Sequence, residues 1–167
     1  MLQISNAVNQ RINQQIVNEL GSYYLYLAMS CELHDMGYQV FASFYARQAE
    51  EERGHAMKFL RYLQERASTV RLGGIPEPRA SHGSPRAIAE AALQQELLVT
   101  SQIHEIVSLS EQEKDYATNN FLQWFVDEQV EEVDTARKIL QLITLAGDAN
   151  LLLAESRVAE LMNKDED

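Results

Sequence analysis

Apolar residues recur along most of this chain in steps of three or four, the spacing that places side chains on one face of an α-helix. The first such stripe begins with Val8, Ile12 and Ile16, and the second with Phe41 and Phe44. Each of the four longest stripes also contains an acidic residue among its large apolar neighbours. Helices with this pattern bury carboxylates when they pack together. Any fold of this chain must therefore stabilise buried acidic groups.

The residues that interrupt the stripes predict four long helices and a shorter fifth one. Gly37 and Gly147 are typical helix ends. All 3 prolines of the chain lie within residues 68–85, which indicates a long connection without helix. The expected helices are residues 5–36, 38–67, 86–113, 117–146 and 149–162.

The lengths of the connections select the topology. Short turns join the first helix to the second and the third to the fourth, so each pair forms an antiparallel hairpin. The 18-residue segment 68–85 reaches up to ~60 Å when extended, which exceeds the ~45 Å length of the helices. We therefore expect one domain over residues 1–167 with an all-α fold. It is an antiparallel four-helix bundle with one long crossover between the second and third helices and a short fifth C-terminal helix.

Charge and composition exclude several classes of protein. The formal net charge of −11 repels nucleic acid and anionic lipid. No apolar stretch reaches the ~18 to 20 residues that cross a bilayer, and the N-terminus lacks the apolar block of a signal peptide. We expect a cytoplasmic protein that binds neither nucleic acid nor membrane. The single cysteine, Cys31, excludes an intrachain disulfide, and its apolar helical surroundings predict a small buried hydrophobe.

The acids within the four stripes are predicted to meet at one level of the bundle. They are Glu19, Glu52 with His55, Glu96 and Glu132. The first two acids lie 18 and 15 residues from Gly37, or ~27 and ~22 Å along their helices. The last two lie 19 and 17 residues from Asp115, or ~28 and ~26 Å. All four therefore fall near the middle of the bundle.

Four buried carboxylates repel one another and require a cation among them. Arg53 points about 100° away from Glu52, because the two are consecutive on a helix. Carboxylates with one imidazole suit divalent iron, manganese or zinc. In addition, Glu52 and His55 have the i, i+3 Glu-x-x-His spacing of di-iron carboxylate bundles. The sequence thus predicts a pair of metal ions.

Other interpretations of the same residues remain open. A lone Glu-x-x-His arises often by chance and then belongs to a solvated helix face. The acids could also stay protonated or exposed in a metal-free structural bundle. A di-iron enzyme acting on an organic substrate or on peroxide would use similar ligands, but it would need an apolar pocket beside the metals.

Four short motifs surround these acids. They are NEL at 18–20 followed by Tyr26, AEEERGHA at 49–56, QQEL at 94–97 and NFLQWFVDEQVEE at 120–132. Through them the chain resembles the haem-free bacterial ferritins over nearly all of its length. The resemblance implies a ferritin-like fold and a ferroxidase centre that binds two iron ions.

The resemblance also implies a role for each matching residue. The ligands of the first iron are Glu19, Glu52 and His55. The ligands of the second iron are Glu52, Glu96 and Glu132, with Gln129 nearby. A third iron position, which bacterial ferritins often add, matches Glu51, Glu128 and Glu131. Tyr26 matches a tyrosine that assists electron transfer during iron oxidation.

The chain differs from the motifs of several related families. Bacterioferritins and rubrerythrins carry a second Glu-x-x-His in the fourth helix, where this chain has Gln129 and Glu132. Bacterioferritins place a haem-ligating methionine where this chain has Arg53, so no haem is expected. Asn119 and Leu122 stand where many animal ferritins have the acids of an iron channel. The path of iron into the protein is therefore not predicted.

The implied function is iron storage and detoxification. Fe(II) would be oxidised by O2 or hydrogen peroxide, and the ferric mineral would be stored inside a homo-oligomeric cage of 24 chains. The alternatives are a di-iron oxidase or peroxidase of rubrerythrin or bacterioferritin type, and a metal-free bundle. Leu151, Leu152 and Leu153 offer apolar surface that the four-helix core does not need, so we expect burial between subunits.

Overall fold

The first two helices form a hairpin whose ends are set by local capping. In the computed structural model, which describes residues 4–164, α1 spans Asn6–Asp35 and α2 spans Gln39–Glu65. The hydroxyl of Ser5 accepts a hydrogen bond from a backbone N–H in the first turn of α1 (3.1 Å). Gly37 adopts φ +90°, a conformation strained for residues with a Cβ, and the chain reverses there.

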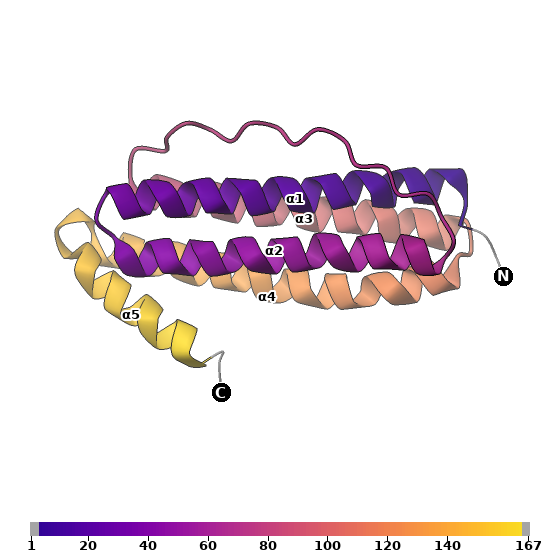
Figure 1. Ribbon diagram of the computed structural model, residues 1–167. Coiled ribbons are helices and arrows are strands. Elements are labelled where there is room, and N and C mark those ends of the chain that lie inside the picture. Colours follow the sequence, from indigo (N-terminus) through magenta and orange to yellow (C-terminus); the bar gives the residue numbers. More distant parts are fainter. Residues whose placement is uncertain (1–3, 165–167) are drawn as a thin grey trace.

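The third and fourth helices form a second hairpin beside the first (Figure 1). α3 spans Pro85–Gln112 and α4 spans Tyr116–Ala146. Ser84 caps α3 and Asp115 caps α4, each by accepting a backbone N–H at 3.1 Å. Gly147, at φ +63°, ends α4. The predicted all-α four-helix bundle is thus confirmed.

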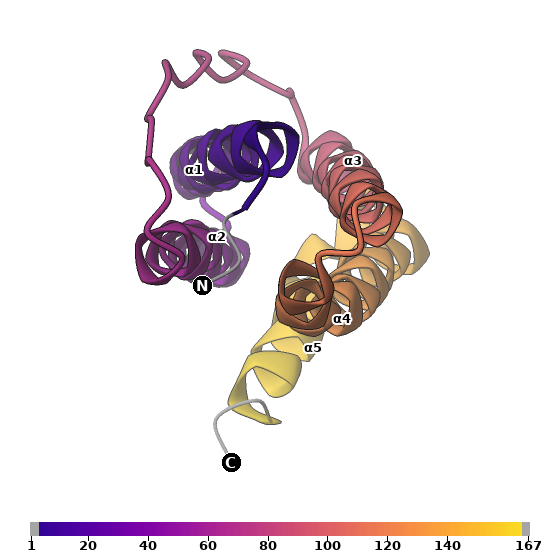
Figure 2. The same ribbon diagram turned by 90° about the vertical axis from the view of Figure 1, so that its right-hand side faces the viewer.

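One long crossover joins the two hairpins, as the spacing of the prolines predicts. Residues 66–84 leave the end of α2, run along the side of α1 that faces away from α4, and reach the start of α3 (Figures 1 and 2). The connection returns the chain to the opposite end of the bundle, so α3 starts near the end at which α1 finishes.

Two polar side chains of α1 fasten this crossover at its ends. Nδ2 of Asn13 donates to the carbonyl oxygen of Thr69 (2.9 Å). Glu32 accepts hydrogen bonds from residues 81–83, the shortest from the hydroxyl of Ser81 (2.6 Å). Burial favours a higher pKa for Glu32, but these hydrogen bonds outweigh it and lower the pKa to about 2. Glu32 therefore remains ionised and bonded to the crossover at neutral pH.

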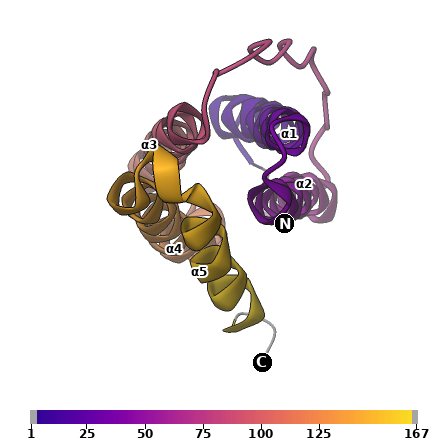
Figure 3. The same ribbon diagram turned by 90° about the vertical axis from the view of Figure 1, so that its left-hand side faces the viewer.

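A short 3-10 turn, Asp148–Asn150, leads from α4 into α5, Leu151–Lys164. The carboxylate of Glu155 accepts hydrogen bonds from the backbone N–H groups of Val40 (2.8 Å) and Phe41 (3.1 Å). These N–H groups belong to the first turn of α2, which has no side-chain cap of its own. α5 is thereby fixed to the end of the bundle and slants away from it (Figures 1 and 3).

The leucine triplet at the start of α5 divides between the bundle and the solvent. Leu151 is buried in the core, whereas Leu152 is 71% and Leu153 is 63% exposed. The expectation of unused apolar surface therefore holds for two of the three leucines and is wrong for Leu151, which packs against the bundle.

The apolar core consists of two clusters at opposite ends of the bundle. One lies near the α1–α2 turn and includes Met29, Phe41 and residues of α5. The other lies toward the start of α1 and includes Phe59 and Phe125. The predicted acids lie in the polar layer between the clusters. Within residues 4–164, no helix is long and apolar enough to cross a membrane.

One detail of the predicted helix faces is wrong. Cys31 is exposed rather than buried, because the inward face of α1 passes through Met29 and Leu33, and the residue midway between them points outward. In α4, the positions three and four residues after Phe125 differ in burial, because Gln129 is buried and Glu128 is half-buried. A helical period of 3.6 residues leaves such neighbouring positions unresolved.

Candidate metal centre

Inward-facing acids from all four long helices occupy the polar layer of the bundle. Each of the side chains concerned is nearly closed to solvent. Their exposed fractions are 1% for Glu19, 2% for Glu52, 5% for His55, 2% for Glu96 and 8% for Glu132. The amphipathic pattern explains this placement, because each acid lies on the same helix face as large buried apolar residues.

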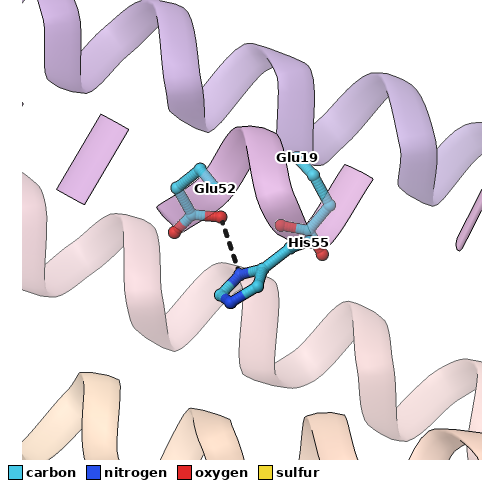
Figure 4. A group of neighbouring side chains, drawn as sticks. All are labelled: Glu19, Glu52 and His55. Carbon is cyan, nitrogen blue, oxygen red and sulfur yellow. Dashed lines mark hydrogen bonds and ion pairs between the residues drawn. The ribbon is translucent and has the colours of Figure 1, made fainter. Parts of the chain in front are cut away.

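A first group joins α1 and α2. Glu19, Glu52 and His55 each offer a ligand atom, and these atoms lie within 4.8 Å of one another (Figure 4). Nδ1 of His55 lies 3.3 Å from Oε2 of Glu52, one helical turn away. Oε2 of Glu19 is buried and makes no hydrogen bond. An oxygen left in this state is costly, and a bound cation would satisfy it.

A second group joins α2 and α4 through the same imidazole. His55, Glu128 and Glu132 also offer ligand atoms within 4.8 Å of one another. Nε2 of His55 lies 3.7 Å from Oε1 of Glu128. The imidazole thus stands between two acidic groups with a nitrogen toward each. Glu128 takes part here, although the family resemblance implies Glu52, Glu96 and Glu132 for the second ion.

Glu96 lies in the same layer but is engaged by other side chains. The hydroxyl of Tyr26 donates to Oε1 of Glu96. Nε2 of Gln129 donates to Oε2 of Glu96 (3.1 Å) and contacts the hydroxyl oxygen of Thr100 (3.2 Å). In this arrangement Glu96 faces Tyr26 and Gln129 instead of completing either group of three.

The acids implied for a third ion lie at the outer edge of the centre. Glu51 and Glu131 are exposed and Glu128 is half-buried. Nε2 of Gln48 donates to Glu51 and, at 3.4 Å, to Oε2 of Glu132. A carboxamide therefore connects the outer acids with the buried ones.

Burial and mutual repulsion perturb the ionisation of the inner acids. Burial is the main cause that raises the pKa of Glu19, with the charge of Glu52 second. The pKa of Glu52 rises through burial and then through the charge of Glu96. The pKa of Glu132 rises to about 9, again through burial and then Glu96. Without a cation these groups favour the protonated form, so a metal ion that binds them displaces protons.

Two carboxamides of the centre are not predicted from the sequence. Gln15, which is 1% exposed, donates from Nε2 to Oε1 of Glu19 (2.9 Å). Gln48 has the contacts given above. A usable signal exists, because each of these glutamines lies four residues before an inward acid, Glu19 or Glu52, on the same helix face.

Aromatic rings close one side of the centre. The ring of Trp124 meets His55 edge-on with centroids 5.5 Å apart, and Phe125 meets it at 6.0 Å. Nζ of Lys58 lies 2.8 Å from the centroid of the Trp124 ring, a cation–π contact. These rings fix the plane of the imidazole and exclude water from that side.

The two groups of acidic residues described above share the imidazole of His55. Together they form a donor set suited to two divalent cations of the first transition series. Independently, a family model for ferritins, described as a ferritin-like domain, matches residues 9–146. The chain belongs to the ferritin family.

Curated relatives are similar in sequence to this ferritin over most of its length. A bacterial non-heme ferritin of Staphylococcus haemolyticus is 34% identical over 145 residues, which is 87% of each chain. A bacterial non-heme ferritin of Bacteroides fragilis is 34% identical over 157 residues, covering 94% of this chain and 99% of the relative. The resemblance to haem-free bacterial ferritins predicted from the motifs is confirmed.

Solved structures show the same fold. The open-pore ferritin of the hyperthermophilic archaeon Archaeoglobus fulgidus superposes with a TM-score of 0.91 at 39% identity, covering 93% of this chain and 98% of that one. A closed form of the same archaeal ferritin, engineered by mutagenesis, gives 0.90 at 39% identity, covering 93% and 96%. The ferritin-like bundle with a short fifth helix is therefore confirmed.

Proposed function

We propose that this ferritin stores iron and that each chain oxidises Fe(II) at the carboxylate–imidazole layer between its two hairpins. Family membership supports the storage role, and the buried cluster around His55 supports the oxidation site. The observation that carries the proposal is the burial of four carboxylates whose charge is tolerated only with protons or multivalent cations. Iron is the substrate and cargo here.

The residues divide into three sets in this proposal. The first Fe(II) is bound by Glu19, Glu52 and His55. The second is bound by Glu52, Glu96 and Glu132, with Glu128 within reach of the same imidazole and Gln129 beside it. A third iron position at the outer edge would use Glu51, Glu128 and Glu131. Glu52 is shared by the first two sets and would bridge both ions.

The carboxylates favour oxidation because negative oxygen ligands stabilise Fe(III) more than Fe(II). Two Fe(II) ions give one electron each to O2, which takes up two protons and becomes hydrogen peroxide. With hydrogen peroxide as oxidant, the same two electrons and two protons yield two water molecules. The acids themselves deprotonate when the ions bind, and those protons are available at the site.

Storage requires more than one chain, because two apolar clusters fill the ends of the bundle within residues 4–164 and the polar layer between them holds only a few ions. The proposed assembly is the family's homo-oligomeric cage of 24 chains. The exposed Leu152 and Leu153 on α5 supply apolar surface for contacts between copies. Fe(III) that leaves the layer would hydrolyse and accumulate inside this cage.

The test is aerobic addition of Fe(II), followed by ferric absorbance and by the size and iron content of the eluted particle. We expect rapid oxidation and a large iron-containing particle. The variants Glu52→Ala and His55→Ala should lose the fast phase, whereas Glu65→Gln, an exposed acid near the end of the same helix, should keep it. A small particle that takes up no iron contradicts storage, and equal rates in all variants contradict the proposed site.

A further inference from the structure

The two oxygens of Glu19 have different surroundings. Oε1 accepts a hydrogen bond from Nε2 of Gln15 (2.9 Å). Oε2 is buried and makes no hydrogen bond. Glu19 belongs to the group with Glu52 and His55 (Figure 4). One oxygen is thus occupied by a protein donor, and the other remains available to a ligand of the centre.

The donor is itself held in one orientation. Gln15 is almost completely buried, one helical turn before Glu19. Its carbonyl oxygen accepts from Nδ2 of Asn18 (3.2 Å), and Asn18 accepts in turn from Nε2 of Gln14 (2.9 Å). Because the carbonyl of Gln15 is engaged by Asn18, its NH2 group is the end that faces Glu19.

The second hairpin contains an equivalent contact. Nε2 of Gln129 donates to Oε2 of Glu96 (3.1 Å), as Nε2 of Gln15 donates to Oε1 of Glu19. Gln129 and Gln15 are both buried. Each hairpin therefore supplies one buried carboxamide that binds one oxygen of an acid in the layer.

We propose that Gln15 is a positioning residue of the metal centre, whose carboxamide binds one oxygen of Glu19 and leaves the other directed at the first metal ion. The inference rests on the proposed function and extends it to a residue outside the ligand set. A glutamate has several side-chain rotamers, and a fixed donor restricts Glu19 to the one that binds. Residues that orient a ligand in this way typically change metal affinity by about 10- to 100-fold when they are removed.

The variants Gln15→Met and Gln15→Leu test the proposal. Methionine keeps the length of glutamine without its donor, and leucine removes the donor with a shorter apolar side chain. Gln10→Leu is the matched control, since Gln10 is exposed on the same helix and lies outside the hydrogen bonds that join Gln14, Asn18, Gln15 and Glu19. Each protein is titrated without oxygen with Zn(II), followed by calorimetry, and with Co(II), followed by visible absorption. Melting of the metal-free proteins is measured in parallel.

We expect both Gln15 variants to bind the first Zn(II) about 10- to 100-fold more weakly and to shift the Co(II) absorption bands, while Gln10→Leu behaves as the unmodified protein. Unchanged affinity and spectra in a folded Gln15 variant overturn the proposal, even if its melting temperature falls. If one variant does not fold, the other decides. A failure of the proposed function gives a different result. In that case the unmodified protein would bind no Zn(II), or its Zn(II) binding would be unchanged in His55→Ala.

Discussion

The phenol of Tyr26 donates a hydrogen bond to the carboxylate of Glu96 inside the polar layer of the bundle. Burial is the main cause that raises the pKa of Tyr26, and the charge of Glu96 adds to it. The phenol therefore stays protonated at neutral pH. A phenol that loses an electron also loses its proton, and Glu96 is in place to accept that proton.

We expect Tyr26→Phe to slow Fe(II) oxidation while leaving the binding of the first ion intact, because Tyr26 contacts Glu96 and not the group at Glu19. A tenfold slower rate corresponds to about 1.4 kcal/mol in the barrier, and we expect at least this effect. Stopped-flow ferric absorbance measures the rate, and rapid-freeze electron paramagnetic resonance detects a tyrosyl radical in the unmodified protein.

The control for this variant is Tyr45→Phe. Tyr45 is buried with its ring centroid 5.9 Å from that of Tyr26, so the change perturbs the same cluster and leaves the Tyr26–Glu96 contact in place. Tyr45→Phe should oxidise Fe(II) at the unmodified rate. Equal slowing in both variants would assign the effect to packing and not to the phenol of Tyr26.

The stability of the metal-free protein should fall as the pH rises from weakly acidic to alkaline values. The pKa of Glu132 is about 9 in the folded chain against an ordinary value of 4.5. A raised pKa stabilises the fold below pH 4.5, and this contribution is lost as the pH approaches 9. Each such group contributes a slope of about 1.4 kcal/mol per pH unit within its window. Denaturant unfolding at fixed protein concentration between pH 5 and 9 measures this change in the free energy of unfolding.

Two comparisons identify the source of this slope. Glu132→Gln should reduce the slope by about 1.4 kcal/mol per pH unit, because the amide does not ionise. Saturation with Zn(II) should also oppose this loss of stability at high pH. A ligand that binds only the folded state, present at 100 times its dissociation constant, adds about 2.7 kcal/mol to the free energy of unfolding. A metal-free protein that becomes more stable toward pH 9 would show that the inner acids are ionised without a cation.

The parts of the fold that depend on local sequence are predictable from the sequence alone. The helix ends at Gly37 and Gly147 are set within one turn of their helices, and the periodic stripes place Glu19 and Glu52 on inward faces. The long crossover follows from loop length. These features need no knowledge of which helices become neighbours.

The parts that depend on contacts between distant segments are not predictable in this way. Glu155 caps α2 from α5 across a separation of 115 residues, and no local pattern signals this. Glu96 turns to Tyr26 and Gln129, while Glu128 approaches His55, because side-chain rotamers decide the partners within a polar layer. The helical stripe specifies which face the acids occupy but not which atoms meet.

Trp124 should report metal binding by its fluorescence. It is the single tryptophan of the chain, and its ring lies 5.5 Å from that of His55. Co(II) or Fe(II) bound at the imidazole should quench the emission strongly at this distance. An anaerobic fluorescence titration measures the effect, and His55→Ala should remove most of it. Quenching that persists in His55→Ala would place the ion elsewhere.

The exposed leucines of α5 should be required for assembly but not for the fold of one chain. Leu152 and Leu153 are 71% and 63% exposed, so replacing both by serine removes little apolar burial within the described part of the chain. Burying such a pair between copies contributes about 1.5 to 3 kcal/mol for each leucine. We therefore expect the double variant to elute as smaller particles at low concentration, with unchanged helix content and with Fe(II) still oxidised.

Ser156→Ala is the control, because this exposed hydroxyl bonds to a carbonyl oxygen within α5, and it should assemble normally. Native mass spectrometry across a dilution series distinguishes the two, and a double variant that keeps its full size on dilution would show that α5 does not hold the assembly together.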